Sequence, residues 1–128
     1  MPVNDLAGGF TYAGITPEQL LAGDEPIKTA FAVASGAKTK YQIAARTTAG
    51  VVDFAPGTHT ALQAVLVMQP CANGASCQYA YAGKFNDDLL ATYNATLYAN
   101  ASFDTWAERE AFFNGLFRLG RLGQGFAN

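Results

Sequence analysis

Hydrophobic residues alternate with small or polar ones in several short stretches of the chain, which is the pattern expected of β-strands. The clearest stretch is 78–82, where two tyrosines alternate with two alanines, so one face should be bulky and the other small. Less regular stretches bounded by glycine, proline or serine predict further strands at 26–33, 41–45 and 51–54. The chain is therefore predicted to be mostly β.

Three other stretches suggest helical turns or leave the element type open. Residues 61–68 form a longer apolar run with no clear period, which suits either a strand buried on both faces or a short helix at its start. Residues 92–97 fit a further strand or a short helix. Thr16 before Pro17 suits the start of a helical turn that ends by Gly23.

The strongest helix signal lies near the end of the chain. Thr105 and Glu108 form a capping box, in which each side chain satisfies a free backbone amide at the start of a helix. The pattern predicts one amphipathic C-terminal helix over about 104–119 that ends near Gly120 and packs its apolar stripe on the sheet. This stripe comprises Trp106, Phe113 and Phe117.

The first 14 residues differ in composition from the rest. Three glycines interrupt the apolar residues, and Asp5 carries the only charged side chain. Because glycine disfavours a helix, we expect a flexible N-terminal arm over 1–14, which could reach roughly 45 to 50 Å when extended. A frayed terminus or a first core strand would have a similar pattern. Residues 15–128 are expected to form a single domain that ends in a short glycine-rich tail.

The composition favours a protein that contacts other proteins. Half of the 128 residues are hydrophobic and only 14% are charged, against about 25% in typical soluble domains. Because so few charges would leave large apolar patches exposed on a single molecule, we expect an oligomer or an assembly subunit. A monomer with many surface alanines is the alternative. The eight Lys and Arg are scattered and the net charge is −2, which argues against direct nucleic-acid binding.

Neither a membrane-spanning run nor a signal peptide stands out. We therefore expect that the protein is made in a cytoplasm and does not associate with a membrane.

Cys71 and Cys77 flank an Asn-Gly turn. Their spacing permits a loop-closing disulfide, but two free thiols are slightly favoured because a cytoplasm keeps thiols reduced.

The residues that could carry chemistry are few. His59, the only histidine, has no adjacent acid and no nucleophile elbow, and a zinc site would need three or four ligands. We interpret Asp87 and Asp88 as turn acids, because neighbouring residues of an extended chain point to opposite sides. We therefore expect no catalytic residue, no metal, no cofactor and no enzymatic activity.

One segment points to a family. Residues 83–86 (Gly-Lys-Phe-Asn), followed by Leu89 and Leu90, come between the tyrosine strand and the predicted helix. Together with segments 21–29 and 41–45, this order resembles the lambda-type head decoration proteins of tailed bacteriophages. The resemblance spans residues 20–120 loosely and makes Gly83, Phe85 and Asn86 a fold-defining turn.

This resemblance implies a β-clip-like α+β fold that assembles as a homotrimer. Such trimers bind at threefold positions on the outer surface of the expanded capsid and stabilise the virion against the pressure of packaged DNA. The N-terminal arm would bind the major capsid protein as an added strand. Here that role falls on Pro2, Val3, Asn4, Leu6, Phe10 and Tyr12. The protein would be made in the cytoplasm of the bacterial host.

The cysteine loop and the long aromatic helix depart from the family pattern. The alternative function is another virion assembly subunit, in a tail or a head–tail connector. A small ligand-binding domain or an enzyme is a third and weaker alternative.

Overall fold

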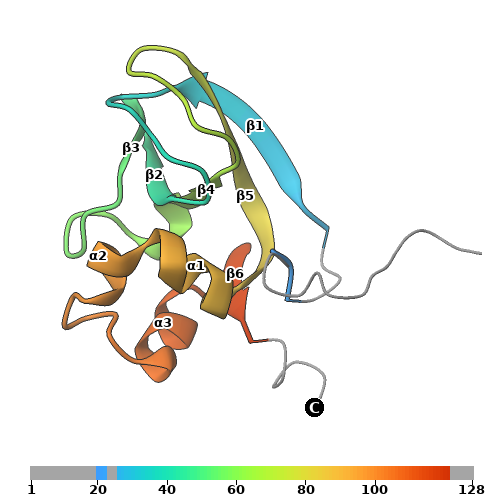
Figure 1. Cartoon of the computed structure of the whole chain (residues 1–128), viewed down its shortest axis with the longest axis vertical. Coiled ribbons are helices and arrows are strands. Elements are labelled where there is room, and N and C mark those ends of the chain that lie inside the picture. Colours follow the sequence, from blue (N-terminus) through green and yellow to red (C-terminus); the bar gives the residue numbers. More distant parts are fainter. Residues whose placement is uncertain (1–19, 23–25, 122–128) are drawn as a thin grey trace, which may run out of the picture.

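The computed structural model describes residues 20–22 and 26–121. Six strands and three short α-helices make up this part of the chain (Figure 1). The strands are β1 (Lys28–Val33), β2 (Ile43–Thr47), β3 (Gly50–Asp53), β4 (Ala64–Val67), β5 (Ser76–Asn86) and β6 (Phe117–Gly120). The helices are α1 (Asp87–Tyr93), α2 (Ala95–Tyr98) and α3 (Trp106–Phe112), and a 3-10 turn, η2 (Ala61–Gln63), precedes β4. The prediction of a mainly β fold is confirmed.

The strands form one rolled sheet. Its order is β1-β5-β4-β2-β3 with antiparallel pairing throughout, and β6 pairs in parallel with the end of β5. The two outer strands of this order meet again, because the Ser35 amide donates to the Val51 carbonyl at 2.9 Å. Gly50 permits this approach: its φ is +109°, and a Cβ there would collide with the Val33 carbonyl oxygen. The three helices lie together at one end of the sheet (Figure 1).

Strand β4 is buried on both faces, which confirms one of the two interpretations of 61–68; the η2 turn at its start confirms part of the other. Ala64 and Leu66 belong to a large cluster that also contains side chains from and around the helices. Val65 and Val67 belong to a second cluster made of residues in and beside the strands. Each large side chain buried in this way contributes roughly 1.5 to 3 kcal/mol to stability.

The predicted turn at Gly83, Phe85 and Asn86 is wrong, because these residues continue strand β5. Backbone partners on both sides hold them extended. On one side the Ala22 amide donates to the Lys84 carbonyl at 3.0 Å, and on the other side β6 runs parallel to 83–86. Gly83 has a φ of +140°, a backbone conformation that favours glycine. Phe85 is fully buried.

The predicted helix over 104–119 is also wrong in extent. The capping box is confirmed, since the Glu108 amide donates to Thr105 Oγ1 at 3.2 Å and the Thr105 amide donates to Glu108 Oε1 at 3.3 Å. The helix ends at Phe112, however, and 117–120 form β6. Phe117 and Leu119 are both buried, which is the two-residue period of a strand. Backbone pairing with β5 then favours a strand over a continued helix at 117–120.

The polypeptide after β5 forms the helices that the sequence left ambiguous. Asn86 is the N-cap of α1, and its side chain accepts a hydrogen bond from the Asp88 amide at 3.2 Å. The end of α1 and the single turn α2 occupy 92–97, so the short-helix interpretation of that segment is the right one. The expectation of a single helix is therefore corrected to three within the described residues.

Several predictions lie outside the described residues. The N-terminal arm belongs to this group, with Pro2, Val3, Asn4, Leu6, Phe10 and Tyr12, as do most of the predicted turn at 16–21 and the tail after Arg121.

Candidate functional site

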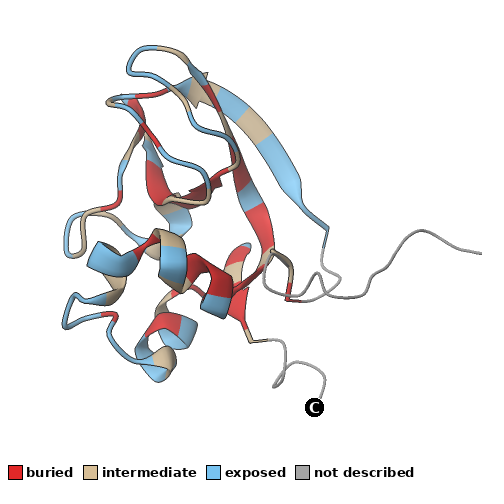
Figure 2. Ribbon diagram, in the orientation of Figure 1, coloured by how far each residue is buried: buried red, intermediate tan, exposed pale blue. Residues whose placement is uncertain are grey.

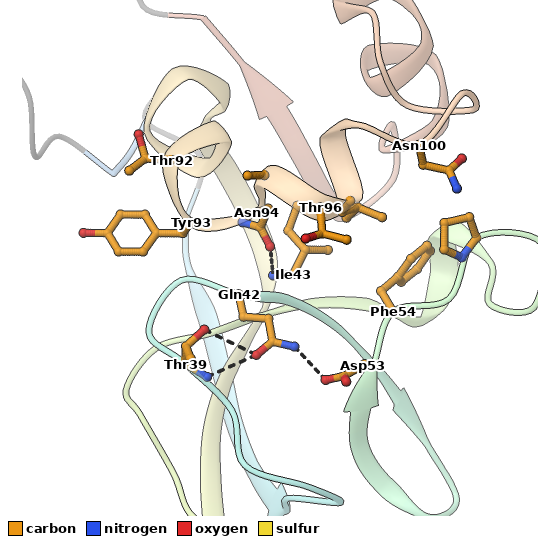
Figure 3. Close-up of a pocket in the computed structure, with 13 residues that line it drawn as sticks. Thr39, Gln42, Ile43, Asp53, Phe54, Thr92, Tyr93, Asn94, Thr96 and Asn100 are labelled. Carbon is orange, nitrogen blue, oxygen red and sulfur yellow. Dashed lines mark hydrogen bonds between the residues drawn. The ribbon is translucent and has the colours of Figure 1, made fainter.

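A groove of about 490 Å³ separates the ends of β2 and β3 from helices α1 and α2 (Figure 3). Tyr93 and Phe54 lie at opposite sides of it in this view, and threonine, asparagine and glutamine side chains line much of the space between. The full lining comprises Thr39, Gln42, Ile43, Asp53, Phe54, Pro56, Thr92, Tyr93, Asn94, Ala95, Thr96, Leu97 and Asn100.

The floor of this groove is built by Asn94, which is buried. Its side-chain oxygen accepts from the Ile43 amide at 2.8 Å, and its side-chain nitrogen donates to the carbonyls of Tyr41 and Leu90, both at 3.0 Å. Tyr41 has a φ of +62° and is the one non-glycine residue with a positive φ in the described part of the chain. Asn94 thus ties the helices to a strained backbone position beside β2, and its polar atoms are used in structure.

The charged groups at the groove are also engaged with each other. Lys38 Nζ lies 3.0 Å from Asp53 Oδ1, and Gln42 Nε2 donates to the same oxygen at 2.7 Å. Partial burial raises the pKa of Asp53, but the hydrogen bonds from Lys38 and Gln42 outweigh it, so the net pKa is lowered. Lys38 itself is buried and also donates to the Ser35 carbonyl at 2.8 Å. Lys38 and Gln42 therefore stabilise the charged form of the Asp53 carboxylate.

A second polar cluster joins two buried charged residues, Asp87 and Arg109, to the partly buried Tyr98. Arg109 Nε and Nη2 donate to the two oxygens of Asp87 at 2.9 and 3.0 Å, and Tyr98 donates its hydroxyl to Asp87 Oδ1 at 2.9 Å. The Arg109 guanidinium also lies 4.2 Å from the centroid of the Tyr98 ring and donates to the Phe103 carbonyl. Burial and the negative charge of Asp87 raise the pKa of Tyr98. Every partner is satisfied, so this cluster holds α1, α2 and α3 together.

The interpretation of Asp87 as a turn acid is therefore wrong. It is 1% exposed and begins α1, because Arg109 and Tyr98 from the following helices neutralise and hydrogen-bond it. Sequence reasoning missed Arg109, which stands 22 residues away from Asp87. No local signal marked Arg109, because it stands between Glu108 and Glu110 in α3 and resembles an exposed charge there.

Strand β1 carries the most exposed apolar side chains of the sheet. Phe31 is 65% exposed and Val33 is 55% exposed, whereas the alternating Ala30 and Ala32 pack against the strand cluster. Figure 2 shows β1 as mainly exposed beside the largely buried β5. Along Lys28–Val33 the described residues provide only β5 as a strand partner. An aromatic and an aliphatic side chain side by side on a strand with a free edge are typical of a protein-binding surface.

The residues singled out in the sequence for possible chemistry lie apart. His59 Nδ1 accepts from the Ala55 amide at 2.8 Å and its ring packs on Phe54. Cys71 and Cys77 are free thiols far from this histidine in the sequence. Among the described residues, no group of three or more His, Cys, Asp and Glu side chains gathers in a way that could hold a metal ion.

Comparisons of the sequence with family models and curated proteins give no relative. The chain matches no protein-family model, and no curated protein sequence is found to match it. In the part of the chain that the structure describes, no helix combines the length and apolar character needed to cross a membrane. The exposed face of β1, defined by Phe31 and Val33, is the described feature with most of the character of a binding site.

Proposed function

We propose that this chain is a head decoration protein of a tailed bacteriophage. It binds as a homotrimer at threefold positions on the outer surface of the expanded capsid, where it contacts the major capsid protein. In this role it performs no reaction. It raises the free energy needed to separate neighbouring capsomers that packaged DNA pushes apart.

The exposed β1 face is the observation that carries this proposal. Phe31 and Val33 together would leave an apolar surface in water on an isolated subunit. Covering them with protein removes that surface from water, which stabilises the assembled state by roughly 25 cal/mol for each Å² buried. The low charge of the whole chain, 14% of residues, supports the same conclusion because few charges would oppose close contact.

The resemblance of segments 21–29, 41–45 and 83–86 to lambda-type decoration proteins supports the choice of a capsid among possible assemblies. In the proposal the rolled antiparallel sheet is a β-clip-like fold. The arm over 1–14 binds the capsid as an added strand, with backbone hydrogen bonds giving affinity and side chains such as Phe10 and Tyr12 giving specificity.

The trimer makes weak contacts effective. When one of three arms detaches, the other two keep it near its site, so rebinding is intramolecular. The total affinity can then exceed that of one arm by several orders of magnitude, about 10² to 10⁴ per added contact. This suits a protein that must stay attached to a shell under sustained internal pressure.

Binding to capsids tests the proposal directly. Purified protein is incubated with expanded, undecorated capsids of the phage that encodes it, and the particles are imaged by electron cryomicroscopy. We expect added density at the threefold positions. A variant that lacks residues 1–14 should remain a trimer in solution and fail to attach. Bare shells with the full-length chain would contradict the proposal.

The alternative virion role is a subunit of a tail or a head–tail connector. Light scattering after size-exclusion chromatography separates the two: the decoration protein should have three times the chain mass of 13.5 kDa, whereas a connector or tail subunit should form larger rings. The groove at Asp53 favours neither role, because its best-placed polar groups already bind one another.

A further inference from the structure

The loop that joins β4 to β5 carries Cys71, and the start of β5 carries Cys77, close to the same cluster of side chains. Cys77 lies in β5 opposite Ala32 of β1. Cys71 lies opposite Lys38, with which it exchanges two backbone hydrogen bonds of 2.9 and 3.1 Å. Each cysteine is therefore positioned by its own backbone pairing, independently of any covalent link between them.

The middle of this loop is anchored as well. The Gly74 amide donates to the Ala34 carbonyl at 2.8 Å, and the Ala34 amide donates to the Ala75 carbonyl at 2.8 Å. The Gly36 amide donates to the Asn73 side-chain oxygen, also at 2.8 Å. The loop is thus held against 34–36, at the point where the end of β1 meets β3. Its conformation is set before any bond between the sulfurs forms.

The two cysteines lie in the same cluster of side chains but differ in access to solvent. Cys71 packs against the cluster that contains Cys77 and is near enough to affect the ionisation of the Cys77 thiol. Cys77 is fully buried, while Cys71 is half-buried. Burial, followed by the hydrogen bond and charge of Cys71, raises the pKa of Cys77 to about 12. A dissolved oxidant therefore meets Cys71 first, since a thiolate must form and be reached for exchange to begin.

We infer that Cys71 and Cys77 are a redox pair that remains reduced in a glutathione-reduced cytoplasm and closes to an intramolecular disulfide in an oxidising medium. Cys71 is the attacking residue, and Cys77 is the resolving residue. The oxidant is a small-molecule disulfide, for which oxidised glutathione serves as the probe.

The reaction proceeds in two exchanges. The Cys71 thiol releases a proton to water, and its sulfur attacks one sulfur of oxidised glutathione; the S–S bond breaks and one glutathione leaves and takes up a proton. Cys77 then releases its proton, and its sulfur attacks Cys71 Sγ in the mixed disulfide. The second glutathione leaves and is protonated. Overall the two cysteines lose two electrons and two protons, and oxidised glutathione becomes two reduced molecules.

The bond would lock the end of the rolled sheet. The loop it closes carries Gly74 and Ala75, which hold Ala34 next to β3. Closing a loop of this size restricts the unfolded chain, and we expect the melting temperature to rise by about 5 to 10 °C. This inference concerns the isolated chain and does not depend on the proposed capsid function.

The experiment starts from the full-length protein, reduced and freed of reductant, and places it in glutathione buffers of increasing oxidised fraction. Intact mass and thiol alkylation report the products, and thermal unfolding reports stability. For the wild type we expect loss of both thiols together, a mass lower by two hydrogens, no covalent dimer, and the higher melting temperature. Persistence of two alkylatable thiols, or accumulation of covalent dimers, would overturn the inference.

Two variants distinguish the roles of the cysteines. Cys77→Ala keeps a small apolar group in the core and should trap one glutathione on Cys71. Cys71→Ser leaves only the buried thiol and should take up glutathione at least about ten times more slowly. If Cys71→Ser reacts as fast as Cys77→Ala, the assignment of Cys71 as the attacking residue is wrong. The wild-type result stands as a test even if Cys77→Ala unfolds.

Discussion

Single residues in this protein take their roles from partners distant in the sequence. Asp87 would be an ordinary helix N-terminal acid if it were in water, where it would favour the positive end of α1. Buried at 1% exposure, it depends on Arg109 and Tyr98 for charge compensation and hydrogen bonds. Removing one partner of such a cluster leaves a buried polar group unsatisfied, and this is usually more costly than the net value of the bond itself.

Tyr98→Phe tests this cluster, including its dependence on pH. At neutral pH the variant should be less stable by about 1.5 to 3 kcal/mol, since it loses a hydrogen bond to a charged group. The pKa of Tyr98 is raised from its ordinary value of 10.0 in the folded chain. Its contribution is therefore complete below pH 10 and is lost as the pH rises above that value, because the unfolded tyrosine then ionises. Urea unfolding from about pH 8 to about pH 11 measures both effects.

The difference between wild type and Tyr98→Phe should consequently shrink at the alkaline end of this range. Tyr81→Phe is a control, because the Tyr81 side chain is 38% exposed and lies in β5, outside the Asp87 cluster; it should cost far less at neutral pH. A difference for Tyr98→Phe that stays constant or grows with pH would show that its hydroxyl ionises in the folded chain as readily as in the unfolded one.

The helices and strands of this fold are short, and backbone pairing with other segments decides which type of secondary structure each segment adopts. Residues 83–86 and 117–120 are two segments whose local patterns suggest a turn and the end of a helix, yet they pair as parallel strands. Segment 20–22 adds backbone partners on the other side of β5. The backbone hydrogen bonds satisfied in this way, together with the buried Phe85 and Phe117 that lie 5.3 Å apart between ring centroids, outweigh local propensity.

Gly50→Ala should disrupt the closure of the roll. Gly50 has a φ of +109°, and a Cβ there would collide with the Val33 carbonyl oxygen of β1. Gly57→Ala is the matched control, because Gly57 also has a positive φ, +84°, but nothing lies within 4 Å of its Cβ position. The control should lose about 1 to 2 kcal/mol from backbone strain alone, whereas Gly50→Ala should lose at least about 3 kcal/mol because a backbone atom must also move.

Chemical denaturation of the two glycine variants gives the comparison. Equal losses would mean that β1 and β3 do not need the close approach seen at Gly50, and that the sheet could open there without penalty.

The whole molecule combines a well-packed core with a surface of low charge. Its two hydrophobic clusters share β4, whose residues alternate between them, so the rolled sheet and the helices form one cooperative unit. The β1 face lies outside both clusters. Within the described residues Phe31 and Val33 stay exposed, and the proposed trimer would supply another protein molecule to cover them.

A double variant of the β1 face tests this view of the assembly. Phe31→Thr with Val33→Thr places a β-branched residue at both positions and so preserves strand propensity, but removes apolar area. We expect self-association to weaken by at least about tenfold in dissociation constant, with thermal stability of the fold little changed. Light scattering over a dilution series measures self-association, and thermal unfolding followed by circular dichroism measures the stability of the fold.

Leu62→Gln is the control for that variant, because Leu62 is 93% exposed but stands alone in η2. It should leave association unchanged. If the Leu62 variant dissociates the assembly and the β1 variant does not, the contact surface lies elsewhere.

Local chemistry could be predicted from the sequence, and long-range pairing could not. The alternation at 78–82, the capping box at Thr105 and the low charge depend on near neighbours or on composition, and the first two appear in the structure as expected. The role of Asp87, the end of α3 and the exposure of Phe31 depend on which distant segments come together.

The sequence by itself determined a mainly β chain with few charges and a helix capped at Thr105, because strand alternation and capping act over a few residues. Tertiary structure decided that the predicted turn is a strand, that the long helix stops at Phe112, and that Asp87 is buried. The physical reason is the same in each case. A backbone amide or a carboxylate adopts the state in which all its hydrogen bonds are satisfied, and here the partners are supplied by segments that only the fold brings together.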